Sequence, residues 1–363
     1  MPTIFLLAFL LIAYLVQRWS VANALKGVDF YYEASLLMAA PGERFELLTT
    51  VSNHSWRFIP YVSMAESIPK LAKIHALGAM ISEGDVGGEA KHVSKVYLMP
   101  RSRLIRRATV SISARGRYIF PGAMLRGGDF LGFGENSENA KYFEQFNEVV
   151  VYPEITAGDF VDKVMGEFLG DLSVRRFIIE DPILTVGFLE YTGRESMKSI
   201  SWTQSARSGQ LMVKSYDYTT ELSVSIVLDI ETVASAKTDK LIESCFSICH
   251  QVCRGLKNKN IMYDFFSNIS VYGSAKNWDY IGEKSGELQL RTILEGLGRA
   301  SYNSYEPLNE LLDRVLRKQQ GRERSIIFIV PEHKDEATIR NKGRGEGRDL
   351  IICAEALNFA NQA

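Results

Sequence analysis

Three cysteines and a histidine lie close enough together in the sequence to suggest a metal site: Cys245, Cys249, His250 and Cys253. Thiolates and imidazoles bind zinc or iron–sulfur clusters, but the Cys-x3-Cys-x3-Cys spacing matches neither a zinc knuckle nor the usual cluster-binding runs. Residues four apart share one helix face, and a reduced cysteine packs as a small apolar side chain. The pattern therefore predicts a buried helix stripe that packs against a sheet.

Asp229, Glu231 and Thr232 form a second candidate site, at the end of an apolar run over residues 221–230. Carboxylate and hydroxyl oxygens bind hard divalent cations. Residues 229 and 231 share a face only if the strand continues, so we expect no metal and no cofactor, and keep these three residues as weak candidates. Ligands of open α/β sheets bind beyond the carboxyl ends of the strands, which places the same residues at a predicted contact edge.

The sequence offers no recognisable nucleophile or phosphate-binding loop. None of the five histidines stands near a Gly-x-Ser-x-Gly turn. The glycines at 127, 128, 132 and 134 have no following Lys-Ser/Thr pair, so they indicate turns. No catalytic residue is predicted.

The elements that must position these residues fall into two parts. Residues 27–153 carry short alternating runs and turn residues, which predict an antiparallel β-sandwich. Residues 154–363 alternate apolar runs (221–230, 261–266, 325–330, 350–354) with helical patterns (238–256, 288–300, 307–319), which predict an open, mostly parallel α/β sheet.

The amino terminus carries an uncharged apolar segment over residues 4–16, within predicted anchor residues 1–26. A helix over residues 1–17 would be about 25 Å long, slightly short of a hydrocarbon core. Arg18 and Lys26 follow it, which predicts a single-pass protein of the cell membrane with its bulk in the cytoplasm. The alternative is a cleaved secretory signal, because Ala22 and Ala24 have the small-x-small spacing of a cleavage site.

Charge excludes some partners and suggests others. The 42 Lys and Arg residues balance 43 Asp and Glu residues, which removes bulk attraction to nucleic acid. Residues 101–126 nevertheless contain seven arginines and no acidic residue. We interpret this run as a solvated face, with anionic lipid headgroups as the alternative partner.

One long motif resembles a known family. The segment over residues 190–216 resembles the hallmark of the bacterial Domain of Unknown Function 58 (DUF58) family, and GRYIFPGAMLRGGDFLGFGE and Val151-Tyr152-Pro153 resemble its upstream stretches. Leu189, Arg194-Glu195 and Lys198 depart from the family pattern. The residues at matching spacings are Glu190, Tyr191, Ile200, Trp202, Ala206, Arg207, Gly209, Leu211, Val213 and Asp229.

The resemblance implies a von Willebrand factor A-like second half. The metal site of such domains needs Asp-x-Ser-x-Ser, whereas this chain has Asp229, Glu231 and Val233 at the three positions. The resemblance also implies a MoxR-type AAA+ ATPase as partner. Read without the family, residues 200 and 202 point to one face of an extended run, and Arg207 can bond a carboxylate such as Glu190, which favours a structural clamp over an exposed docking surface.

These observations lead to two hypotheses about function. The leading one is a membrane-tethered scaffold or adaptor without catalysis that works with the ATPase. The alternative is a divergent cell-envelope hydrolase whose site is not recognisable from the sequence.

Overall fold

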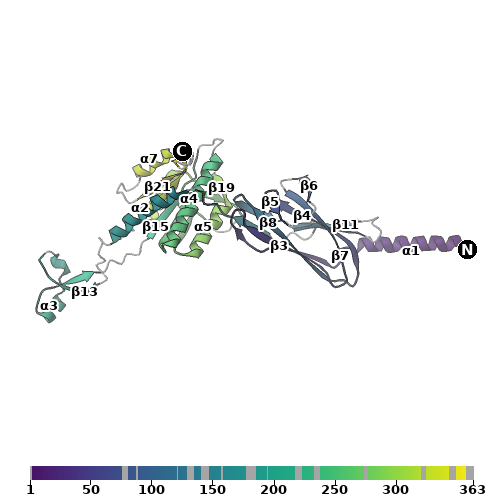
Figure 1. Cartoon of the computed structure of the whole chain (residues 1–363), viewed down its shortest axis with the longest axis horizontal. Helices are drawn as coiled ribbons and strands as arrows, with labels where there is room; N and C mark the ends of the chain where they lie inside the picture. Colours follow the sequence, from purple (N-terminus) through teal and green to yellow (C-terminus); the bar gives the residue numbers. More distant parts are fainter. Residues whose placement is uncertain are drawn as a thin grey trace. The chain divides into compact units, whose positions relative to one another are not determined.

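The computed structural model describes residues 2–75, 81–86, 89–120, 122–128, 135–139, 147–156, 158–176, 185–193, 195–216, 223–232, 238–273, 277–319, 324–342 and 349–356. The chain divides into two compact units, one of Met1–Glu154 with Leu297–Arg299 and one of Ile155–Gly296 with Ala300–Ala363. Antiparallel sheets dominate the first unit and a mostly parallel sheet forms the centre of the second, so the architecture is mixed α/β (Figure 1).

The first unit begins with helix α1 (Pro2–Ala22), and many of its large apolar side chains are more than half exposed. Among the residues that the structure describes, no helix combines the length and apolar character that crossing a membrane requires. Ala24 and Leu25, just after the helix, are buried. A Cβ atom at Gly127 would lie 2.9 Å from the Leu25 side chain, so the absence of a side chain at Gly127 allows this close approach.

Among the described residues of the first unit, twelve strands follow α1. They form a sheet of order β1-β3-β8-β5, a second of order β11-β10-β4-β7-β6 and a third of order β2-β12-β9. The strands are β1 (Val28–Ala34), β2 (Met38–Ala39), β3 (Arg44–Asn53), β4 (Ile59–Pro69), β5 (Ala72–Ile74), β6 (Ile81–Val86), β7 (Glu89–Leu98), β8 (Arg103–Ile112), β9 (Gly116–Phe120), β10 (Gly122–Gly128), β11 (Glu135–Asn139) and β12 (Asn147–Val151).

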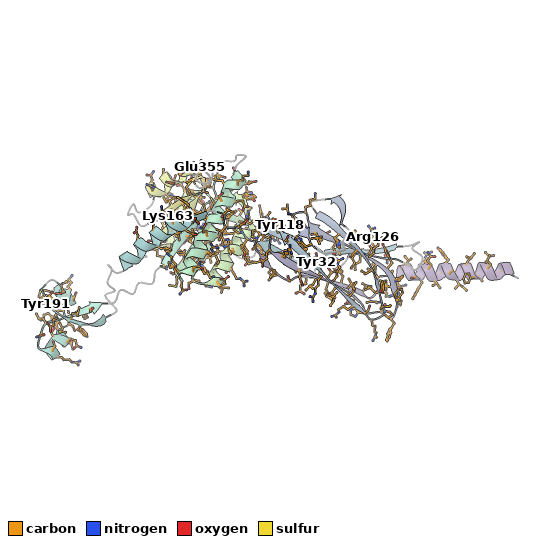
Figure 2. The ribbon with its side chains drawn as sticks, viewed as in Figure 1. Tyr32, Tyr118, Arg126, Lys163, Tyr191 and Glu355 are labelled. Carbon is orange, nitrogen blue, oxygen red and sulfur yellow. The ribbon has the colours of Figure 1, made fainter. Side chains whose placement is uncertain are left out.

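Alternating side chains of these strands build a shared core. Val51 of the first sheet packs with Val62, Met64 and Leu98 of the second, the packing of a β-sandwich. Tyr32 lies in a neighbouring cluster with Phe120 and is labelled in Figure 2.

A buried charged group also connects the two sheets. The Glu66 carboxylate on β4 accepts hydrogen bonds from Thr49 Oγ1 (2.8 Å) and His92 Nδ1 (3.1 Å) and pairs with the Arg106 guanidinium. Burial alone would raise the pKa of Glu66, but the hydrogen bond from His92 and the charge of Arg106 outweigh it and lower the pKa below its usual value. Thr49 and Arg106 belong to one sheet and Glu66 and His92 to the other, so the network fixes the sheets to each other.

The second unit is built on the sheet β18-β16-β15-β20-β21, in which β18 alone runs antiparallel to its neighbour. Its elements are α2 (Gly158–Arg176), β13 (Thr185–Glu190), the 3-10 helix η1 (Met197–Ser199), α3 (Trp202–Ser208), β14 (Met212–Tyr216), β15 (Ser223–Leu228), α4 (Thr238–Asn258), β16 (Met262–Ser267), β17 (Ile269–Val271), β18 (Tyr280–Lys284), α5 (Glu287–Arg299), β19 (Ala300–Ser304), α6 (Leu308–Lys318), β20 (Ser325–Val330), α7 (His333–Lys342) and β21 (Leu350–Cys353).

Helices cover both faces of this sheet. All six residues of β20 are buried, as an unbroken apolar run requires. Val227 and Phe328 pack with α6 and α7, and α4 contacts β16 and β20. The predicted strands and helices of this unit are confirmed to within a few residues, whereas the sequence did not predict β18 or α7.

Candidate functional site

The site lies at the carboxyl edge of the parallel sheet, where the direction of the chain's path through the sheet reverses. From β15 the chain passes through α4 to β16 on one side, and β20 pairs with β15 on the other side. Such a reversal leaves an opening beyond the carboxyl ends of the two central strands. Asp229 directly follows β15, which confirms its predicted place at this edge.

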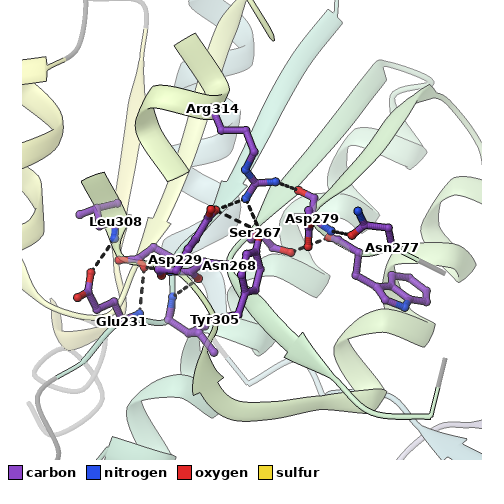
Figure 3. Close-up of polar contacts among 12 residues, drawn as sticks. Asp229, Glu231, Ser267, Asn268, Asn277, Asp279, Tyr305, Leu308 and Arg314 are labelled. Carbon is purple, nitrogen blue, oxygen red and sulfur yellow. Dashed lines mark hydrogen bonds and ion pairs between the residues drawn. The ribbon is translucent and has the colours of Figure 1, made fainter. Parts of the chain in front are cut away.

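Asp229 is fully buried and held by the loop that follows the neighbouring strand (Figure 3). Its Oδ1 accepts hydrogen bonds from Asn268 Nδ2 (2.6 Å) and the Glu231 backbone N–H (3.0 Å). Asn268 Oδ1 accepts in turn from the Ile230 N–H (3.0 Å), so Asn268 connects the ends of β15 and β16. Within the described part of the chain, Asp229 Oδ2 is buried without a hydrogen-bond partner.

Burial raises the pKa of Asp229 to about 7, although the hydrogen bonds from Glu231 N–H and Asn268 favour the charged form. Asp335 and Glu231 raise it further through charge repulsion. Asp335 lies in the first turn of α7 and is itself mostly buried, and burial raises its pKa to about 6. The two carboxyls therefore share one poorly solvated, negatively charged environment.

Glu231 is exposed and binds a helix end. Its Oε2 accepts from the backbone N–H of Leu308 (2.7 Å), the first residue of α6. A carboxylate at this position satisfies an otherwise unpaired N–H and interacts favourably with the helix dipole. This contact explains why a glutamate serves where the metal motif would need a serine.

Further carboxylates surround the edge. Glu332 follows β20 and pairs with Lys334 (2.8 Å), and Glu355 follows β21 and accepts from the His333 backbone N–H (3.3 Å). The hydrogen bond to Glu332 raises the pKa of Lys334, and burial opposes this rise. The negative charges of Asp335 and Glu231 raise the pKa of Lys334 further. Glu355 is labelled in Figure 2.

Arg314 of α6 rigidifies the opposite flank. Its guanidinium donates to the backbone oxygens of Ser267 (2.9 Å) and Asp279 (2.5 Å) and to Tyr305 Oη (2.7 Å), and it pairs with Glu306 (Figure 3). These bonds connect the end of β16 with the segments before β18 and α6. Arg314 thus holds these described segments together.

Cation binding at this edge has limited support. One group among the described residues, His333, Glu336 and Cys353, brings possible ligand atoms within 4.8 Å of one another. The Cys353 thiol is buried, which raises its pKa, and it lies 3.6 Å from the Pro331 carbonyl. Asp229 Oδ1 is already saturated by two donors, and Val233, the third position of the metal motif, lies outside the described residues. Thr232 is half-buried.

The cysteine stripe is confirmed as core. Cys245, Cys249 and Cys253 are free thiols on α4 with no exposed surface, and burial raises the pKa of Cys245 and Cys249. His250 is also mostly buried.

The residues of the family-like motif form a separate small element. Strands β13 and β14 pair antiparallel, the Tyr191 N–H donates to the Leu211 carbonyl (2.8 Å), and Ile200 bridges to Val213. Ile200 and Val213 are buried there, and Figure 2 labels Tyr191. Residues 217–222, between this element and β15, and Arg194 lie outside the described residues.

The expectation of an extended run across residues 200–202 is wrong. Helix α3 starts at Trp202 and ends at Ser208, and Gly209 caps it with a φ of 75°, which suits glycine. Ser205 Oγ stabilises the turn because it donates to the Ser201 carbonyl and accepts from the Met212 N–H. Trp202 is 66% exposed, and Glu190, Ala206 and Arg207 are exposed as well, which does not favour the predicted clamp.

Sequence reasoning missed Asn268 and Asp335. Asn268 stands in an ordinary Ser-Asn-Ile-Ser stretch, and only its position directly after a buried strand could have indicated it. Asp335 opens a polar helix without an apolar stripe, so no periodicity marks it.

Comparisons with known proteins add little. No family model matches the sequence, and no curated protein matches it. Solved structures with partial likeness include the CARDB domain of a Pyrococcus furiosus protein in complex with di-metal ions (13% identity, 34% of this chain and 84% of that chain, TM-score 0.21). Others are a cohesin module of a Clostridium perfringens family 33 glycoside hydrolase (9%, 34% and 96%, 0.23) and a non-cellulosomal cohesin from Archaeoglobus fulgidus (10%, 34% and 91%, 0.23). TM-scores this low carry no argument about this chain.

Proposed function

We propose that the chain is a non-catalytic adaptor whose α/β unit captures a basic segment of a partner protein at the carboxyl edge of its sheet. The observation that carries the proposal is the excess of carboxylates around the strand reversal. Glu231, Glu332, Asp335, Glu336 and Glu355 follow β15, β20 and β21, against Lys334, which pairs with Glu332, and His333 and Arg340, which pair with Glu336. Arginine or lysine side chains of a partner are the groups that such an edge attracts.

The proposal includes the family and partner that the motif implies. We place the chain with the DUF58 proteins, with a von Willebrand factor A-like second unit and a MoxR-type AAA+ ATPase as its partner. The open sheet with helices on both faces and the pre-formed loops at its edge support this reading.

We also propose that the chain associates with the cell membrane through α1, with its two units in the cytoplasm. Side chains such as Ile4, Phe9 and Leu11 are 59–69% exposed along this helix. Leaving so many large apolar groups in water is unfavourable, and acyl chains would cover them.

The alternative of a hydrolase has less support. A general acid or base must reach the proton that it transfers, and Asp229, the carboxyl with the most perturbed pKa at the edge, has no exposed surface.

The test is direct binding between the full chain and a purified MoxR-type ATPase encoded beside its gene. The double variant Glu332→Gln/Glu336→Gln removes two carboxylates from the edge and should weaken capture by at least about tenfold. Added salt should weaken binding of the wild-type chain, because it screens the charges. Glu287→Gln is a control for the loss of a single carboxylate away from the edge, because Glu287 is exposed at the start of α5, where it pairs with Lys257 near the end of α4.

Equal loss in the control and the double variant would show that general charge, and not this edge, governs capture. No binding by the wild-type chain to the neighbouring ATPase, or the lack of such a gene, would reject the partner.

A further inference from the structure

One loop of the sandwich, at residues 54–58, lies against the end of α1 and the segment that follows it. The Arg57 guanidinium donates to the Lys26 carbonyl (3.0 Å) and lies over the Trp19 ring at 5.5 Å. The His54 N–H donates to the Gly27 carbonyl (2.8 Å). We call the loops at residues 54–58 and 99–102, together with Arg103, the loop face.

Asn53 holds the two loops of the loop face together. It is 1% exposed, and its Nδ2 donates to the carbonyls of Arg57 (2.7 Å) and Met99 (3.0 Å). Its Oδ1 accepts from the Ser55 N–H (3.0 Å) and hydroxyl (2.7 Å). The Arg101 N–H donates to the Ser55 carbonyl (3.0 Å) at a residue with φ of 51°, which few non-glycine residues adopt. The loop face is therefore pre-organised.

A cavity of about 330 Å³ opens on this face. It is lined by Ser52, Asn53, His54, Arg101, Ser102 and Arg103. Ser52 is 3% exposed, and within the described part of the chain its buried hydroxyl has no hydrogen-bond partner. Two guanidinium groups and a hydroxyl are donors that suit a phosphate group. One lining residue, His54, pairs with an acidic side chain, because its Nε2 lies 3.1 Å from the Asp29 carboxylate.

Exposed aromatic and apolar side chains flank the cavity. Trp56 is 75% exposed beneath the Arg101 guanidinium, which lies 4.0 Å from its ring centroid. The Phe58 and Tyr97 rings lie tilted against each other with centroids 6.2 Å apart and are 38% and 63% exposed, and Met99 is 53% exposed. Tryptophan and tyrosine next to basic residues are typical of the boundary between lipid headgroups and acyl chains.

We propose that the loop face binds anionic phospholipid headgroups, with a lipid phosphate in the Arg101–Arg103 cavity and Trp56 inserted at the headgroup boundary. The inference rests on the membrane association proposed above. Because α1 ends beside this face, a membrane that holds α1 would bring headgroups to the cavity. Each basic residue near an anionic leaflet increases the affinity of the protein for the membrane. The exposed aromatic side chains add apolar contact with the bilayer.

The lipid assignment is favoured over a soluble phosphate compound by the exposed apolar rim. A small hydrophilic ligand would fill the cavity and leave Trp56, Phe58 and Met99 in water, whereas a bilayer covers all three.

The test measures partitioning of the full chain onto neutral phosphatidylcholine vesicles and onto vesicles that also contain phosphatidylglycerol. The ratio of the two partition coefficients reports the headgroup contribution, because the contribution of α1 is common to both. Arg101→Gln/Arg103→Gln should lower this ratio by roughly 25-fold, about fivefold for each removed charge. The control Lys70→Gln/Lys73→Gln removes the same charge from exposed residues beside β5, which pairs with the far end of β8, and should leave most of the ratio intact.

Fluorescence gives a second readout that does not depend on the arginines. In a Trp19→Phe/Trp202→Phe background the remaining tryptophans are Trp56 and the buried Trp278. Acyl chains that carry bromine should quench Trp56 emission more strongly on anionic vesicles than on neutral ones.

An unchanged ratio in the arginine variant, an equal fall in the lysine control, or unquenched Trp56 on anionic vesicles would each overturn the proposal. Stabilisation by glycerol phosphate without any preference for anionic vesicles would assign the cavity to a soluble phosphate ester instead. Absence of binding to neutral vesicles would reject only the proposed membrane association of α1. Loss of ATPase capture would reject only the proposed binding at the sheet edge, so these two proposals and the lipid proposal can fail separately.

Discussion

Replacing Asp229 by asparagine should change the pH dependence of the second unit's stability. Asparagine has the same shape, and its Oδ1 can still accept from Asn268 and the Glu231 N–H. The substitution removes the ionisation of a carboxyl that the fold encloses completely and places an amide NH2 where Oδ2 stood, a cost that does not vary with pH. The experiment therefore isolates one titration.

The magnitude follows from the pKa of Asp229, about 7 in the fold against an ordinary 3.8. A carboxyl with a raised pKa contributes stability that is fully present below the ordinary value and is lost as the pH rises through the folded value. By linkage, this one group lowers the unfolding free energy of the wild type by about 3 kcal/mol between about pH 5 and about pH 8. Asp335, whose pKa is raised to about 6, acts with the same sign in both proteins.

The assay is urea unfolding followed by the emission of Trp278, which is 4% exposed in the second unit. Trp19, Trp56 and Trp202 are 59–75% exposed in the fold, so their emission changes little on unfolding. The stability of Asp229→Asn relative to wild type should grow by about 3 kcal/mol from about pH 5 to about pH 8.

Asp313→Asn is the control, because this exposed carboxyl forms only a surface pair with Lys342. Its effect should be small and similar at both pH values. A stability difference for Asp229→Asn that stays flat with pH would refute the reasoning, since it would mean that burial does not oppose the ionisation of this carboxyl.

Three further outcomes are expected. The lowered pKa of Glu66 gives the sandwich stability that is present above the ordinary value of 4.5 and lost as the pH falls through the folded value; Glu66→Gln should therefore flatten its acid unfolding, followed by circular dichroism. Deleting residues 1–19 should move the chain to the soluble fraction of a cell extract with both units folded, because buried Leu25 is retained; continued membrane association would show that α1 is not what holds it there. Mg²⁺ should leave the melting temperature unchanged near neutral pH, since Asp229 Oδ1 is already bonded twice and Glu231 binds α6; a melting shift that disappears in Asp229→Ala would restore a metal site.

The α/β unit could be predicted largely from its apolar runs. Strands β15 (SVSIVL) and β20 (SIIFIV) are mainly apolar and largely buried on both faces, and their short length and β-branched content favour strands over helices. Helices α4 and α6 show a clear apolar stripe. Alternation of such elements then determines the parallel sheet and its open edge.

Elements that bury little could not be predicted in this way. Helix α7 has only Asp335 and Ile339 buried, and β18 is a partly exposed edge strand. Helix α3 is held by Ser205, whose hydroxyl donates to the Ser201 carbonyl and accepts from the Met212 N–H, and the second bond forms only once β14 lies beside the helix. Tertiary contacts, and not local pattern, decide these segments.

The acidic edge connects stability to binding. The charge of Asp335 raises the pKa of Asp229. Each of the two carboxyls also has one oxygen without a hydrogen-bond partner among the described residues. A basic side chain that docks beside Asp335 favours its ionised form and so lowers its pKa, which means that capture releases a proton near the pH at which this carboxyl titrates. Linkage is reciprocal, so raising the pH through about 6 strengthens capture while it weakens the empty fold. Under the proposed function, a carboxyl edge that is unfavourable when empty and favourable when occupied would suit a cationic partner, and its cost in stability supports the proposed binding role.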